Sequence, residues 1–78
     1  MDLQQAVKLR LLNLCKERNI TINKLSTLSG ITQSTVNGLI NGTSQNPKLL
    51  TIVRLCYGLD MPLKDFFDDE VFIDIDDE

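Results

Sequence analysis

The sequence predicts an all-α fold, with five short helices packed into one small domain and followed by an acidic tail. Three observations support this prediction. Apolar residues recur at helical spacing, capping residues and glycines separate the apolar segments, and no segment before residue 68 alternates like a strand. The 78 residues, of which 42% are hydrophobic, are enough for one small core and leave no room for a multi-domain enzyme.

The first helix is expected over residues 3–18. Asn19 follows as its stop, because Asn tolerates the left-handed conformation of a helix end. Leu9 and Leu12 form a second, weaker apolar strip, which is a dimer contact, a seat for the tail, or scattered surface leucines. The main apolar stripe of this helix consists of Leu3, Val7, Leu11 and Leu14, with Cys15 beside them.

Two short helices should follow, over residues 22–29 and 33–41. Thr21 and Thr32 are suited to cap their first turns. Gly30 breaks the first of the two helices and Gly42 ends the second.

The fourth helix is expected to start at Asn46 and Pro47, read as cap and first helical position, and to end near Leu59. Pro62 should open a last short helix that continues to Phe67. The inner face of the fourth helix is predicted to carry Ile52, Leu55, Cys56 and Leu59.

Residues 22–41 have the pattern of a helix-turn-helix motif. Ser26 is small and lets the second helix approach closely, and Gly30 supplies a turn conformation that a residue with a Cβ resists. The other constraints at fixed offsets are the inner apolar residues Leu25, Ile31, Val36 and Leu39.

With this motif in place, the chain resembles the phage-repressor/Cro-like helix-turn-helix (XRE) family over about residues 7–67. The resemblance implies a compact, five-helix, lambda-repressor-like domain that binds a double-stranded DNA operator as a homodimer. It also implies a transcription regulator, and the small size favours a repressor. On this interpretation residues 1–67 form the DNA-binding domain and residues 68–78 the tail.

The resemblance further implies that the helix over residues 33–41 enters the major groove, where its first residues touch base edges. Gln33 and Asn37 carry side-chain amides that can bind adenine, and Ser34 can donate or accept a hydrogen bond. These three are the expected base-reading residues. The phosphate contacts are expected from Thr21, Asn23, Lys24, Asn41, Thr43, Ser44, Gln45 and Lys48.

The sequence departs from the family pattern at several positions. Ile22 stands where many members have a phosphate-binding Gln, which puts that contact in doubt. Cys15 and Ile40 replace the Arg and Glu that many members pair between helices, and an apolar pair avoids the desolvation cost of a buried ion pair. Leu12 occupies a position that is often basic in the family.

The net charge of −3 is divided unevenly along the chain. Residues 68–78 carry seven acids and no base, whereas residues 1–67 hold eight bases against four acids, a net charge of +4. The basic body permits a surface that faces phosphates but does not demonstrate one.

The tail allows several interpretations. Val71, Ile73 and Ile75 alternate like one face of a short strand, which would pair with the same strand of a second chain. The tail would otherwise fold back and bury Phe72 on the first or the fifth helix, or compete with DNA for the basic body. The remaining alternative is a disordered, solubilising end.

The composition excludes several other classes of protein. No His is present, and Cys15 and Cys56 cannot complete a zinc site, so neither a metal, a cofactor nor an enzyme activity is expected. No signal peptide or membrane segment is apparent, which favours a cytoplasmic protein. The rival hypothesis is a protein-interaction module, antitoxin-like or antirepressor-like, that keeps the fold but binds DNA weakly.

Overall fold

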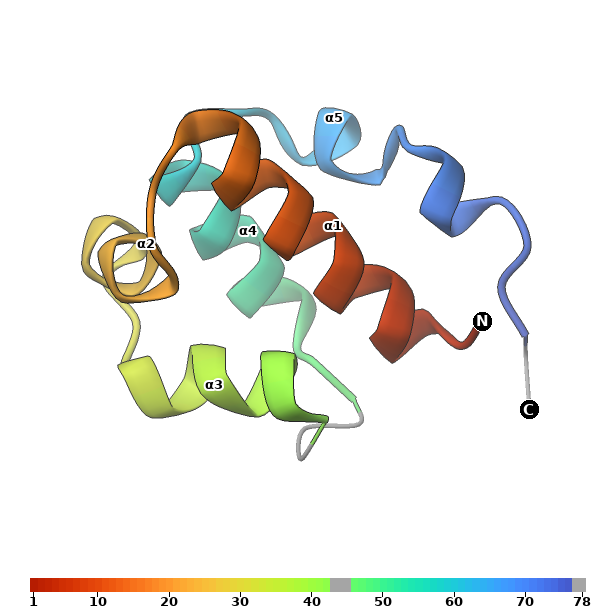
Figure 1. Ribbon diagram of the computed structural model, residues 1–78, viewed down its shortest axis with the longest axis horizontal. Coiled ribbons are helices and arrows are strands. Elements are labelled where there is room, and N and C mark those ends of the chain that lie inside the picture. Colours follow the sequence, from red (N-terminus) through yellow and green to blue (C-terminus); the bar gives the residue numbers. More distant parts are fainter. Residues whose placement is uncertain (43–45, 77–78) are drawn as a thin grey trace.

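A computed structural model describes residues 1–42 and 46–76 of the chain. The expected all-α fold of five α-helices is confirmed, and a short 3-10 helix follows them (Figure 1). The elements are α1 (Leu3–Arg18), α2 (Ile22–Ser29), α3 (Gln33–Asn41), α4 (Leu49–Gly58), α5 (Leu63–Phe67) and the 3-10 helix η1 (Glu70–Phe72). No helix in the described ranges is long and apolar enough to cross a membrane.

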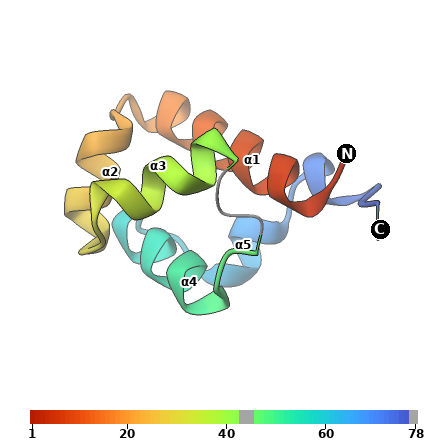
Figure 2. The ribbon, with the colours of Figure 1, turned by 90° about the horizontal axis from the view of Figure 1, so that it is seen from below.

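The core lies where α1, α2 and α4 meet, and α3 covers its lower face in Figure 1. Figure 2 shows the same molecule from below, with α3 in front of α1 and α4. The buried apolar side chains include Val7, Leu11, Leu14, Leu25, Val36, Leu39, Ile52, Leu55, Leu59 and Phe66. Among the described residues the core is therefore almost entirely aliphatic, and Phe66 supplies its one fully buried aromatic ring.

The start of α1 differs from the sequence prediction in one residue. Leu3, expected on the inner stripe, is 48% exposed, and Ala6 and Val7 are the first buried residues. Leu3 is the first residue of the helix, so its side chain lies beyond the edge of the core. Asp2 caps the helix, because its carboxylate accepts a hydrogen bond from the Gln5 backbone N–H at 2.8 Å.

The turns follow the local signals in the sequence. Asn19, Gly30 and Gly42 have positive φ angles of 56°, 68° and 81°, so each ends its helix in the left-handed conformation. The hydroxyls of Thr21 and Thr32 accept hydrogen bonds from backbone N–H groups in the first turns of α2 and α3, as expected of capping residues.

The predicted starts of the last two helices are wrong by one or two residues. Lys48, not Asn46, is the N-cap of α4, and it makes no side-chain capping hydrogen bond. Pro62 is the N-cap of α5 rather than its first helical residue. The φ angle that proline fixes suits an extended residue before a helix as well as the first helical residue, so the sequence alone could not separate the two.

Gly58 allows α4 to pack closely against α2, a role that the sequence analysis did not assign to it. A Cβ atom at this position would stand 3.0 Å from the backbone nitrogen of Ser29. The two helices therefore meet backbone to backbone at their C-terminal ends. Because α2 carries the turn to α3, this contact helps to fix the orientation of the helix-turn-helix motif.

Arg10 is the one charged residue among the buried positions of α1, with 9% of its surface exposed. Its guanidinium donates hydrogen bonds to the carbonyl oxygens of Phe66 and Asp65, each at 2.8 Å. It also forms an ion pair with the carboxylate of Asp69 at 2.9 Å. A single side chain of α1 thus binds the end of α5 and the beginning of the tail.

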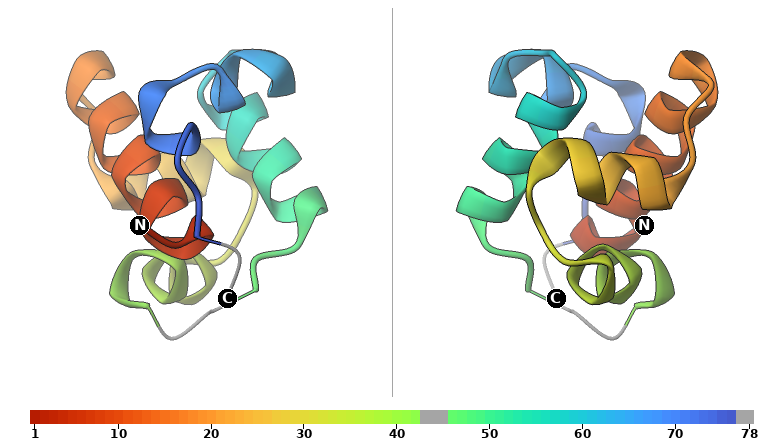
Figure 3. Two further views of the ribbon diagram at one scale, coloured as in Figure 1. Left: turned by 90° about the vertical axis from the view of Figure 1, so that its right-hand side faces the viewer. Right: turned by 90° about the vertical axis from the view of Figure 1, so that its left-hand side faces the viewer.

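Of the alternatives for the tail, the structure shows the one in which it folds back onto the fifth helix, and residues 71–75 form no strand. Residues 70–72 form η1, and Phe72 packs its ring against Phe66 and Phe67, with ring centroids 6.0 and 5.0 Å apart. The tail then runs back along α1 (Figure 3) until the backbone N–H of Asp76 donates to the carbonyl oxygen of Met1 at 3.1 Å. Packing against two phenylalanine rings gives the tail a partner within its own chain.

Asp69→Ala should destabilise the fold because it leaves the buried guanidinium of Arg10 without its carboxylate. We expect a loss of about 1.5–3 kcal/mol in the free energy of unfolding, measured by urea denaturation. Asp68→Ala is the matched control, since Asp68 is exposed and forms no ion pair among the described residues. Equal stability of the two variants would show that the Arg10–Asp69 pair contributes nothing.

Candidate nucleic-acid interface

The turn between α2 and α3 is closed by backbone hydrogen bonds. The N–H of Ile31 donates to the carbonyl oxygen of Ser26 at 3.2 Å, and the N–H of Gly30 donates to that of Thr27 at 3.3 Å. This pattern is a Schellman-type helix end, which requires the positive φ angle of Gly30. The turn therefore gives α3 a fixed direction relative to α2.

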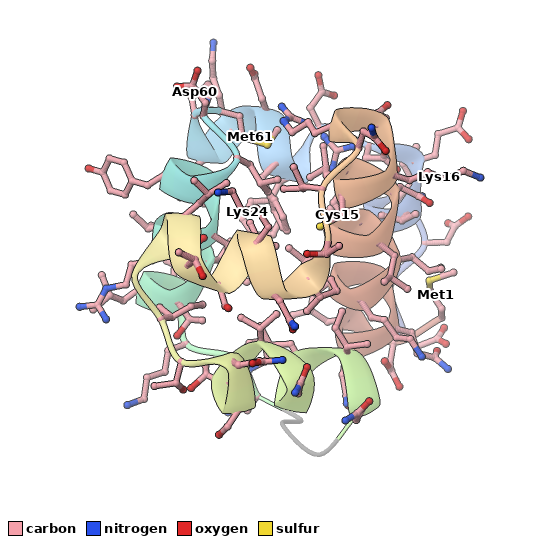
Figure 4. The ribbon with its side chains drawn as sticks, turned by 60° about the vertical axis from the view of Figure 1, so that its left-hand side comes forward. Met1, Cys15, Lys16, Lys24, Asp60 and Met61 are labelled. Carbon is pink, nitrogen blue, oxygen red and sulfur yellow. The ribbon has the colours of Figure 1, made fainter. Side chains whose placement is uncertain are left out.

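The inner side of α3 is anchored by two residues. Val36 is fully buried and Leu39 is 3% exposed, whereas most of the remaining residues of the helix are polar and exposed. Figure 4 shows α3 along the lower edge of the molecule, where its polar side chains extend outward. One whole side of this helix is thus free for a ligand.

The three expected base-reading residues share this outer side. Gln33, Ser34 and Asn37 are all exposed. Asn37 follows Gln33 by four positions and Ser34 by three, so the side chains gather over one turn of the helix. The structure therefore brings these three polar groups together at the N-terminal half of α3.

Gln33 makes one contact that the sequence analysis did not anticipate. Its side-chain Nε2 donates a hydrogen bond to Oδ1 of Asn23, in the first turn of α2. The bond holds the Gln33 amide in one orientation and leaves its Oε1 and second N–H available. Asn23, expected to contact phosphate, is thus placed beside Gln33, the first of the expected base-reading residues. Sequence spacing gave no signal for this pair, because it depends on the angle between α2 and α3.

The expected phosphate contacts lie around both ends of α3. Thr21 and Asn23 begin α2, Asn41 ends α3, and Lys48 is exposed just before α4. In Figure 4, Lys24 lies on the side of α2 that faces away from α3, so it lies farther than Asn23 from the expected base-reading residues. Three other expected contacts, Thr43, Ser44 and Gln45, lie outside the described residues.

Three of the four positions that depart from the family pattern pack in or against the core, whereas the fourth, Leu12, is exposed. Cys15 is 5% exposed, and Ile22 and Ile40 are partly buried and pack against the core cluster. Ile22 therefore supports the packing of α2 at the position where a Gln would contact phosphate. Tyr57 on α4 is 78% exposed.

The two thiols are chemically protected by the core. Burial raises the pKa of Cys15, with a smaller opposing effect from the charge of Arg18. Burial also raises the pKa of Cys56, and the charge of Arg10 opposes it. The thiolate is the reactive form, so both side chains should be inert in the folded protein.

The comparisons with known proteins agree with this geometry. The sequence model of the family described as Cro/C1-type HTH DNA-binding domain matches residues 10–71. The crystal structure of the prophage Lp1 protein 11 is similar with a TM-score of 0.83 and 36% sequence identity, over 96% of this chain and 100% of that chain.

A transcriptional regulator of the HTH_3 family from Vibrio cholerae is similar with a TM-score of 0.77. The match covers 87% of this chain but 38% of that protein, and the identity of 22% makes this a likeness of fold alone. No curated protein matches the sequence.

The buried thiols lead to a prediction about their reactivity. At pH 8, a thiol reagent should label native Cys15 and Cys56 far more slowly than the same residues in urea-unfolded protein. Folding raises the pKa of both thiols, so each keeps its proton to a higher pH in the folded protein than in the unfolded protein. The protonated thiols therefore stabilise the fold at a pH below the pKa that they have in the unfolded chain. This stabilisation is lost as the pH rises through the pKa that they have in the folded protein. Labelling of the native protein at the rate of an exposed cysteine would contradict this account.

Proposed function

The chain belongs to the family of Cro/C1-type HTH DNA-binding domains, and we propose that it binds a specific double-stranded DNA operator and thereby represses transcription. The observation that carries the proposal is the exposed polar face of α3, formed by Gln33, Ser34 and Asn37. Repression requires only that the domain occupy its operator and exclude other proteins from it. The proposed role accordingly places the protein in the cytoplasm.

In the proposed complex α3 lies in the major groove. A groove about 12 Å wide admits one α-helix and presents a distinct set of donors and acceptors at each base pair. The Gln33 amide can bind N6 and N7 of one adenine, and its hydrogen bond to Asn23 orients it before DNA arrives. Ser34 and Asn37 would read neighbouring bases from the same face.

The flanking residues would hold the domain in register on the DNA backbone. The first backbone N–H groups of α2, near Thr21, have no carbonyl partner within the helix, and such a helix start favours an anion. Asn23 and Lys24 lie in that turn, and Asn41 and Lys48 lie at the other end of α3. Thr43, Ser44 and Gln45 remain proposed contacts on the basis of the family resemblance.

We propose that two copies of the chain bind together through the outer face of α4. Leu50 and Tyr57 are two turns apart on this face, and they are 58% and 78% exposed. Leu49 extends the same apolar surface at the start of the helix, with 61% exposure. Association would cover these side chains and supplement a core that is small for an isolated domain.

Gln33→Ala should weaken binding to the preferred site by about 1–3 kcal/mol and relax the choice of base at one position. The measurement is a titration of wild type and variant against the preferred site and against single-base variants of it. Lys48→Gln is the contrasting variant. It should weaken binding to all sequences alike, because a phosphate contact carries no base information.

The titration also separates the two candidate functions. A loss that is equal on every DNA sequence would show that Gln33 does not read a base. Failure of the wild type to distinguish any DNA sequence would favour the rival function, a protein-interaction module that keeps the same fold.

Replacing Leu50 and Tyr57 together by Ser should abolish cooperative binding to an inverted repeat. The double variant should fold normally, since both side chains are exposed. Leu28→Ser is the control, because Leu28 is a 48% exposed leucine on α2 rather than on α4. Unchanged cooperativity in the double variant would place the dimer contact elsewhere.

A further inference from the structure

The start of α1 and the end of α3 together line a polar cleft of about 260 Å³. Figures 1 and 2 both show these two helix ends lying side by side, far from each other in sequence. The residues of the cleft that bear on its function are Asp2, Gln4, Lys8, Asn41 and Gly42.

The two helix ends are in close contact at this cleft. Gln4 approaches Gly42 so nearly that a Cβ atom on the glycine would stand 3.1 Å from the Gln4 Nε2 atom. Lys8 follows Gln4 by one helical turn and is exposed, so its ammonium group lies on the same side of α1. The position of Lys8 on α1 therefore lies beside the end of α3, and its side chain lines the same cleft.

The charges around Lys8 leave its ammonium group without a partner in the described part of the chain. The ion pairs found there involve the Met1 amine, Arg10 and Arg18. The carboxylate of Asp76 is 3.5 Å from the Met1 amine, so these two charges compensate one another. The carboxylate of Asp2 lines the same cleft and accepts the capping hydrogen bond from the backbone of Gln5, but it forms no ion pair with Lys8. The Lys8 ammonium group is therefore not engaged by a carboxylate in the described part of the chain.

We infer that Lys8 is a further phosphate-contacting residue, which binds the DNA backbone next to the end of α3. This inference rests on the proposed function. Asn41 lines the same cleft and is a proposed phosphate contact. Duplex DNA carries about one negative charge per 1.7 Å of its axis, so a flexible cation beside a groove-bound helix meets a phosphate. The interface thereby extends from the helix-turn-helix motif onto α1.

The test is the salt dependence of DNA binding by the full chain. Each phosphate contact contributes a slope of about −0.9 in a plot of log K against log salt concentration. Lys8→Gln should lower the steepness of this slope by about 0.9, and Lys8→Arg should preserve it. Between 50 and 200 mM salt, the affinity difference between wild type and Lys8→Gln should then shrink by about 3.5-fold.

Lys64→Gln is the matched control, because Lys64 is exposed on α5, on the side of the molecule opposite α3 (Figure 1). Its slope should equal that of the wild type. Lys8→Gln should unfold at the wild-type temperature, because Lys8 is exposed. It should also keep the wild-type base preference, because the proposed contact of Lys8 is with the DNA backbone and carries no base information.

An unchanged slope in Lys8→Gln, with sequence preference intact, would overturn this inference and leave the proposed function standing. Equal loss of slope in Lys8→Gln and Lys64→Gln would also overturn it, because the effect would then be one of net charge alone. A wild-type chain that fails to bind any duplex would overturn both proposals together.

Discussion

The positive φ angle at Gly30 is the constraint on which the exposed polar face of α3, the proposed DNA-facing surface, depends. It lets α2 end in a closed turn, so that Ile31 enters the core and α3 leaves in a new direction. Val36 and Leu39 then anchor α3 in the core, and the opposite side of the helix remains exposed to solvent. A residue with a Cβ resists this conformation, so a change at Gly30 would alter the direction of α3 as well as the stability of the turn. The contact of Gly58 with Ser29 supports the same arrangement from α4.

Local signals in the sequence predicted the elements of the fold well. Thr21, Thr32, Gly30 and Gly42 each act within one turn of the chain, and the structure places their caps and turns as expected. Pro47 and Pro62 were harder to place, because the φ angle of proline suits both the first helical residue and an extended residue before the helix. The exposed polar face of α3 was also visible in the sequence. The hydrogen bond from Gln33 to Asn23 could not be predicted from the sequence, because it depends on the angle between α2 and α3, which no short motif encodes.

The tail could be predicted only in part. The sequence allowed both a strand, from the alternation of Val71, Ile73 and Ile75, and a fold-back that buries Phe72, and the structure shows the fold-back onto the rings of α5. Arg10 then joins α1 to both α5 and the tail, although its place in the first helix gave no sign of a partner 59 residues away. Removal of residues 68–78 would therefore also remove the carboxylate that pairs with Arg10. Functional experiments on this protein are best made with the full chain.

If the exposed face of α3 reads a DNA sequence, in vitro selection with the full chain will show it. From a random double-stranded pool at near-physiological salt, we expect enrichment of an inverted repeat whose half-sites are centred about 34 Å apart, one turn of the double helix, or a multiple of that spacing. A pool that stays random through repeated rounds would show that α3 reads no DNA sequence, and would favour a protein partner for the same fold.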